Sequence, residues 1–132
     1  MKNMLLVLLL GVSYTANSGI TSIKPIQTVH PYFNFVPSFE NIHLHKQGKG
    51  IKVQWSVSEA AAVTSFDIES TYEDPGDIYS NWSIKGHLPS DGRRMNMFSD
   101  MIAIYPGQVH YRIVAHTNNG DVVSQPIPLT IE

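Results

Sequence analysis

The 132-residue sequence contains no cysteine. This absence excludes disulfide frameworks, thiolate zinc sites, cysteine nucleophiles and a lipid-modified cysteine at a processed N-terminus. Stability must therefore come from an apolar core. Basic residues are also few, because the nine Lys and Arg residues are scattered except for the pair Arg93 and Arg94, and the formal net charge is -2. No basic stripe exists for a phosphate backbone to follow, so we expect no nucleic-acid partner.

The N-terminal apolar run, residues 4–10, is far shorter than the roughly 20 residues that span a bilayer. It follows the positive charge of Lys2 and precedes the small-residue pattern Ala16-Asn17-Ser18. This layout is typical of a secretory signal peptide. We therefore predict a signal peptide over residues 1–18 with cleavage after Ser18, no membrane span after cleavage, and export to the periplasm, the cell surface or the extracellular space.

Residues 19–39 contain Pro25, Pro31 and Pro37 among many apolar residues, which is too apolar a composition for a free linker. Proline removes a backbone donor and fixes φ, so this segment is expected to be an extended arm along a sheet edge. Docking of the arm on a partner stays open as the other interpretation.

The remaining residues, 40–132, show the alternation of half-buried antiparallel strands. The clearest case places Ile51, Val53, Trp55 and Val57 on one face of a strand and polar residues on the other. Turn residues separate such segments, and Asn119-Gly120 is the strongest hairpin signal. We predict one all-β domain with about seven strands in an antiparallel β-sandwich. The expected strands cover 41–46, 50–58, 65–73, 79–88, 93–101, 109–117 and 121–131.

These residues resemble a fibronectin type III domain, a member of the immunoglobulin-like sandwiches. Trp55 stands where that family has its core tryptophan, and residues 104–115 resemble the signature that leads into its sixth strand. The resemblance implies that Tyr111 is a corner tyrosine whose hydroxyl bonds to backbone near Pro106-Gly107. Tyr111 lies one residue later than the family's usual spacing, so a bulge or a different corner bond is also open.

A closer resemblance is to the fibronectin-like modules on exported proteins of the Bacteroidetes. It rests on Trp55, Phe66-Asp67-Ile68-Glu69, Trp82-Ser83-Ile84 and Tyr111-Arg112-Ile113. Such modules usually accompany a larger enzyme or adhesin, and no such region is present in this sequence. The resemblance thus implies a fold and an exported location more than an activity.

Metal, cofactor and catalytic sites are not predicted. His43 and His45 share one strand face, but two ligands do not make a site. The acidic residues Glu69, Glu73, Asp74 and Asp77 lack the spacing of a calcium loop and suit turn chemistry instead. No motif places a nucleophile beside a base, so we expect neither a catalytic residue nor a cofactor.

Aromatic residues are the remaining candidates for binding. Tyr72, Tyr79 and Trp82 cluster around one turn, and Tyr105, beside the Pro106-Gly107 turn, is the aromatic that we most expect to be exposed. Trp82 and Ile84 fit an inward parity, and we expect core packing for both, as we do for Met95, Met97 and Met101. The predicted binding residues are therefore Tyr72, Tyr79 and Tyr105.

The favoured function is a non-catalytic module that mediates protein-protein interaction or acts as a spacer at the cell envelope, with an envelope or extracellular protein as its partner. The alternative is a carbohydrate-binding accessory module whose exposed rings stack on a polysaccharide. Exposed, coplanar Tyr or Trp rings would favour this alternative.

Overall fold

The computed structural model describes residues 35–101 and 105–132. The predicted signal peptide, with Pro25 and Pro31 of the predicted arm, lies outside these residues. The last residue of that arm, Phe39, begins the first strand. Just before it, Ser38 and Ser58 exchange backbone and side-chain hydrogen bonds, which hold the start of the domain against the end of the second strand.

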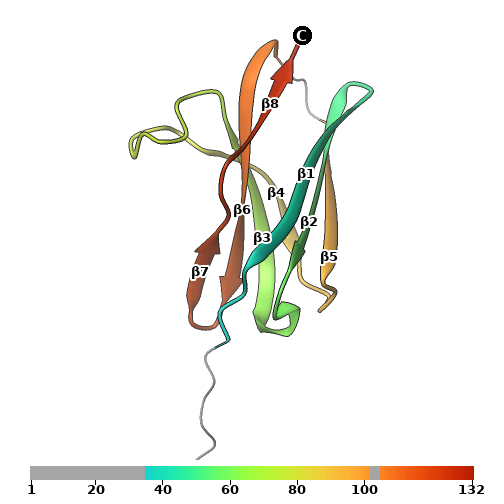
Figure 1. The fold of residues 1–132 in the computed structure, drawn as a ribbon, viewed down its shortest axis with the longest axis vertical. Helices are drawn as coiled ribbons and strands as arrows, with labels where there is room; N and C mark the ends of the chain where they lie inside the picture. The colour runs from blue at the N-terminus through green and yellow to red at the C-terminus, as the bar shows by residue number, and fades with distance from the viewer. Residues whose placement is uncertain (1–34, 102–104) are drawn as a thin grey trace, which may run out of the picture. The chain divides into compact units, whose positions relative to one another are not determined.

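The described residues form eight antiparallel strands in two sheets, so the all-β prediction is confirmed (Figure 1). One sheet has the order β1-β2-β5, and the other has the order β4-β3-β6-β7, with β8 also paired to β6. The strand bounds are β1 Phe39–Gln47, β2 Gly50–Val57, β3 Val63–Thr71, β4 Ser83–Pro89, β5 Met95–Asp100, β6 Gly107–Thr117, β7 Gly120–Val123 and β8 Ile127–Ile131.

The core contains the inward-facing side chains of both sheets, as the alternation predicted. Trp55 on β2 and Phe66 on β3 make an edge-to-face contact with their ring centres 5.3 Å apart, which joins one sheet to the other. The remaining fully buried residues extend this contact along β2, β3 and β6. They are Ile51, Val53, Val57, Val63, Ile68, Val109, Tyr111, Ile113 and Ala115, with Ile131 of β8.

The predicted last strand, 121–131, is interrupted and forms β7 and β8 instead. Pro126 has no N–H to donate to a ladder, and β7 ends at Val123. At the interruption, Ser124 donates its N–H to the carbonyl of Ile113 and accepts the Ile113 N–H on its hydroxyl. The long strand β6 therefore keeps its hydrogen bonds although its partner changes from β7 to β8.

Two side chains that we expected in the core lie elsewhere, because β4 starts at Ser83 and is bulged. Ile68 pairs with Gly86, whereas Glu69 pairs with Ile84, so one residue of β4 is left over between the two pairs. Such a bulge turns the following side chains to the other face of the sheet. Ile84 consequently faces solvent, and Trp82 lies before the strand and is half-buried.

The methionine prediction is also wrong, because Met95, Met97 and Met101 are all exposed. In β5, the register with β2 pairs Met97 with the outward-facing Gln54 and pairs Phe98 with the core residue Val53. Phe98 therefore packs on the core, and the methionines of the strand face outward.

Tyr111 is buried, but its hydroxyl donates to the Asp100 carboxylate at 2.7 Å and not to backbone near the turn. Burial raises the pKa of the Tyr111 phenol far above its ordinary value, and the hydrogen bond to Asp100 adds to this. Tyr111 thus stays a neutral donor. The expected turn between residues 58 and 64 is a short 3-10 helix, Ala60–Ala62. In the described part of the chain, no helix is long and apolar enough to cross a membrane.

Candidate functional site

The connection between β3 and β4, residues 72–82, projects from the side of the five-stranded sheet (Figure 1). Two aspartates shape its tip. Asp74 accepts the Gly76 N–H on its carboxylate at 2.9 Å, and Asp77 accepts the Tyr79 N–H in the same way at 2.9 Å. These are Asx turns, in which a short side chain takes the place of a backbone acceptor.

The base of this loop is closed by further hydrogen bonds. Glu73 accepts the backbone N–H of Asn81 at 2.8 Å, and the hydroxyl of Ser80 donates to the carbonyl of Asp74 at 2.6 Å. The acidic residues that could suggest calcium are therefore engaged in holding the loop. This arrangement agrees with the predicted turn chemistry.

Two apolar side chains stand on this ordered loop without cover. Ile78 is 87% exposed and Tyr79 is 84% exposed. Single exposed apolar residues are common on protein surfaces, but neighbouring ones on a hydrogen-bonded loop lose little freedom when they bind. Ile78 was not singled out from the sequence, in which the next expected strand began at residue 79.

The structure brings together two of the three predicted binding residues. Tyr72 donates its hydroxyl to the carbonyl of Tyr105 at 3.2 Å and accepts the Tyr105 N–H at 3.1 Å. Their ring centres are 6.4 Å apart and their planes meet at 70°. Both rings are exposed, whereas Tyr79 makes no ring contact with either of them within the described residues. The two rings do not form a flat platform.

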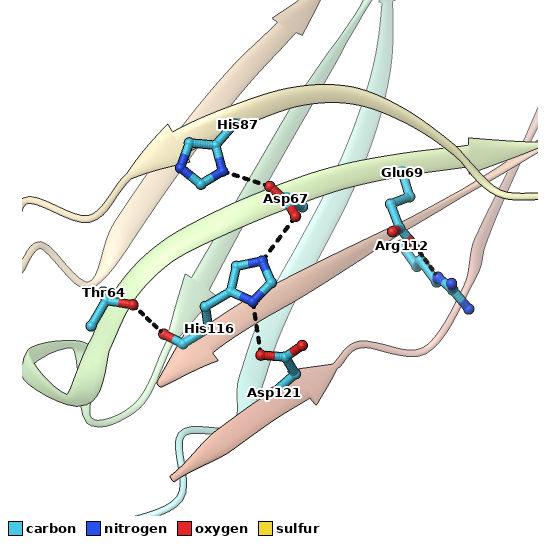
Figure 2. Close-up of polar contacts among 7 residues, drawn as sticks. All are labelled: Thr64, Asp67, Glu69, His87, Arg112, His116 and Asp121. Carbon is cyan, nitrogen blue, oxygen red and sulfur yellow. Dashed lines mark hydrogen bonds and ion pairs between the residues drawn. The ribbon is translucent and has the colours of Figure 1, made fainter. Parts of the chain in front are cut away.

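A second group of polar residues crosses the outer face of the five-stranded sheet (Figure 2). Asp67 on β3 lies between two imidazoles, 2.6 Å from Nδ1 of His87 on β4 and 2.8 Å from Nε2 of His116 on β6. His116 continues the chain with its Nδ1 2.7 Å from the Asp121 carboxylate on β7. We call these four residues the His-Asp chain. It links β4, β3, β6 and β7, four of the five strands of this sheet.

The charges of the His-Asp chain support one another. Hydrogen bonds to Asp67 and then to Asp121 raise the pKa of His116 above its ordinary value of 6.5, against a smaller effect of burial. The hydrogen bond from His87 lowers the pKa of Asp67 below 3.8, and His116 adds to this while burial opposes it. The ion pair between His116 and Asp67 is consequently intact at mildly acidic pH.

We predict that this chain makes stability depend on pH. Because folding raises the pKa of His116, its stabilisation is complete below about pH 6.5 and is lost as the pH rises through the folded-state value. Because folding lowers the pKa of Asp67, its stabilisation is present above about pH 3.8 and is lost below it. The free energy of unfolding, measured by urea titration, should be highest between these values and decline toward pH 8.

The matched variants are His116→Gln and His45→Gln. His116→Gln should flatten the decline above pH 6.5, whereas His45→Gln, which removes a histidine without an ion pair in the described residues, should keep it. An equal decline in all three proteins would contradict the assignment to His116.

The chemistry of the His-Asp chain is that of a structural cross-link. Both ring nitrogens of His116 are engaged by carboxylates. The nearby hydroxyl of Thr64 donates to the carbonyl of His116 and not to an imidazole. Among the described residues, no hydroxyl is hydrogen-bonded to a ring nitrogen of this chain, as a nucleophile activated by histidine would be.

Arg112 on β6 connects the outer face of this sheet to loop 72–82. Its Nε donates to Glu69 on β3 at 2.6 Å, and its guanidinium lies 4.0 Å from the ring centre of Trp82. A cation over an indole ring is attracted by the negative charge of the ring face. This contact anchors the C-terminal end of loop 72–82 to the sheet.

Comparisons with known proteins bear on the fold. No protein-family model matches the sequence, and no curated protein is similar to it. The chain is similar in structure to the pectate lyase Pel3 of Pectobacterium carotovorum, with a TM-score of 0.52 and 17% identity. A likeness to β-glucosidase 3B of Thermotoga neapolitana has a TM-score of 0.44 and 10% identity.

Both likenesses are partial. The alignment with the pectate lyase covers 69% of this chain but 26% of that enzyme, and the alignment with the β-glucosidase covers 73% of this chain but 17% of that enzyme. At this identity, the first likeness shows that the fold occurs within a larger protein. It does not transfer an activity.

The described residues contain no group of three or more His, Cys, Asp or Glu side chains placed to hold a metal ion. The sequence reasoning missed Asp67, His87 and Asp121, because only the register between strands reveals such neighbours. The alternation of residues does place His116 and Asp67 on the outward faces of their strands. Only the pairing of β3 with β6 shows that the two residues are neighbours.

Proposed function

We propose that the chain is an exported, non-catalytic fibronectin type III-like β-sandwich that binds a protein partner at the cell envelope through loop 72–82. The strand pairing supports this fold. Pairing of β2 with β5 and of β3 with β6 is the pairing of strands B with E and C with F in immunoglobulin-like sandwiches. β4 pairs with β3 and not with β5, which differs from the constant-type immunoglobulin arrangement.

The observation that carries the proposed function is the exposure of Ile78 and Tyr79 on a loop that its own side chains hold in shape. Aromatic and aliphatic anchors supply much of the free energy at protein interfaces. Ordering them before binding reduces the entropy lost in the complex. A loop built in this way suits insertion into an apolar pocket of a partner.

Binding of a polysaccharide is the second candidate, and it rests on the exposed tyrosines. Sugar rings stack best on flat, solvent-facing aromatic surfaces. The Tyr72 and Tyr105 planes meet at 70°, and the Tyr72 hydroxyl is already engaged by backbone of Tyr105. This geometry favours a protein partner over a polysaccharide.

The proposal is tested by capture from envelope extract with the chain and with the double variant Ile78→Ser, Tyr79→Ser. The double variant should recover the same partner at least about tenfold less well, since interface anchors contribute about 2 kcal/mol or more each. Both side chains are exposed, so the free energy of unfolding should change by less than about 0.5 kcal/mol.

The matched control is Ile84→Ser, which removes an exposed isoleucine from the outer sheet face instead of the loop. It should leave capture unchanged. Equal loss in Ile84→Ser, or capture that does not respond to the double variant, would contradict the role of the loop. Retention of soluble polysaccharide by the chain, lost on Tyr72→Ala or Tyr105→Ala, would favour the second candidate.

A further inference from the structure

Every methionine of the described residues lies along one edge of the three-stranded sheet. Met95 and Met97 belong to β5, which pairs with β2 alone among the described strands, and Met101 follows β5 directly. Phe98 of β5 packs on the core, so by alternation Met95 and Met97 point to the outer face of the sheet. Met95 is 71% exposed, Met97 52% and Met101 70%. Three thioethers therefore stand in solvent within one short stretch of chain.

These thioethers are the most readily oxidised groups of the chain. The sequence has no cysteine, whose thiolate would otherwise react first. The other two methionines, Met1 and Met4, belong to the predicted signal peptide. The core of the described residues consists of aliphatic and aromatic side chains without a methionine. Sulfoxide formation damages a protein when it makes a core side chain polar, so oxidation at the three exposed positions leaves this core unchanged.

The surroundings of β5 have room and hydrogen-bond donors for an added oxygen atom. A hollow of about 430 Å³ adjoins Met95, and Gln54 and Arg94 also line it. Gln54 is the cross-strand partner of Met97 as well, which places their Cβ atoms about 5 Å apart. A sulfoxide oxygen accepts hydrogen bonds, and the Gln54 amide and the Arg94 guanidinium both carry N–H donors. The oxidised side chains therefore suit this surface.

We propose that Met95, Met97 and Met101 form a modification site that consumes peroxides while the sandwich stays folded. In each step, a sulfur lone pair attacks one oxygen of hydrogen peroxide. The S–O bond forms as the O–O bond breaks, and the proton on the transferred oxygen moves to the departing hydroxide. The products are a methionine sulfoxide and water, so sulfur loses two electrons and the peroxide gains them. One chain takes up three oxygen atoms at this site.

The test treats the full chain with hydrogen peroxide and follows its tryptic peptides by mass spectrometry. Cleavage after Arg94 and Arg112 places the three methionines in one peptide, 95–112, apart from Met1 and Met4. This peptide should gain three oxygen atoms. It should gain them within about threefold of the rate for the same peptide free in solution, because susceptibility follows exposure. The midpoint of urea unfolding, measured after oxidation, should be unchanged.

A thioether placed in the core provides the matched control. Ile113 is fully buried, and Ile113→Met is a change of similar volume that a core tolerates. Its sulfur falls in the next tryptic peptide, 113–132, so it is measured in the same digest. It should take up oxygen at least about tenfold more slowly than peptide 95–112 does. A triple variant with leucine at positions 95, 97 and 101 should keep the urea midpoint and take up no oxygen in this peptide.

Three results would overturn the proposal. Oxidation of peptide 95–112 more than about tenfold slower in the folded chain than in the free peptide would show that the thioethers are covered. A lower urea midpoint after oxidation would show that the sandwich does not tolerate the sulfoxides. Equal rates in peptide 95–112 and at Ile113→Met would assign the reaction to an unfolded population instead of the surface. All three are independent of the proposed role of loop 72–82.

Discussion

Replacing Trp55 with alanine should lower the free energy of unfolding by about 3–5 kcal/mol, the usual cost of truncating a large buried aromatic. Trp55 is 1% exposed, and its ring packs edge-on against Phe66 of the opposite sheet. The change would remove the largest side chain of the shared core and leave a cavity between the sheets. Because small domains have about 5–15 kcal/mol of stability, this is a large fraction of the total. Urea unfolding followed by far-ultraviolet circular dichroism measures it.

Trp82→Ala provides the matched control, since it truncates the same residue type at a half-buried position. It should cost far less, because that indole loses a contact with Arg112 but leaves no core cavity. The indole N–H of Trp55 has no hydrogen-bond partner in the described residues. Trp55→Phe therefore removes no hydrogen bond and keeps an aromatic ring in the core, so it should cost less than Trp55→Ala. A loss below about 1 kcal/mol for Trp55→Ala would contradict its place in the core.

The second large effect is expected at Gly50, the first residue of β2. A Cβ atom built there would lie 2.4 Å from the carbonyl oxygen of Asp100, which belongs to the neighbouring strand β5. That atom is backbone and cannot rotate away, so Gly50→Ala must push the two strands apart. We expect a cost of about 3 kcal/mol, at the upper end of the range for overpacking. Thermal or urea unfolding of the variant measures the loss.

Gly86→Ala is the comparison, because its new Cβ would meet the ring of Phe98, 2.3 Å from two ring atoms. A side-chain ring at the margin of the core can shift where a strand cannot, so the cost should be smaller, about 1 kcal/mol. If Gly86→Ala destabilised the domain more than Gly50→Ala did, the close approach of β2 and β5 would not be the controlling contact.

Much of the strand pattern was predictable because alternation reports burial directly when one face of a strand is wet. β2 and β6 follow this rule, and their predicted inward residues are buried. The same rule applied to β5 would have placed Phe98 inward and Met95 and Met97 outward. The methionines were misplaced because residue type was weighed above parity, and methionine suits a core as well as a surface.

Ile84 could not have been placed in this way. Its parity within β4 predicts burial, but the bulge opposite Ile68 and Glu69 reverses the face. Nothing local in the sequence marks that bulge, because it arises from how two strands must pair around the core. The predicted binding residues show the same contrast between what local sequence reveals and what only long-range contacts decide. Tyr105 is exposed as predicted, whereas its contact with Tyr72 joins loops 33 residues apart.

The sequence by itself determined the class of the fold, most strand positions, the buried face of β2 and β6, and the turn chemistry of loop 72–82. Each of these depends on residues close together in the chain, through strand alternation or side chains that cap nearby backbone. Only the tertiary structure decided the grouping of the His-Asp chain, the bond from Tyr111 to Asp100 and the contact between Tyr72 and Tyr105. These depend on strand register, which is set by how both sheets close over one core, and no local pattern encodes that register.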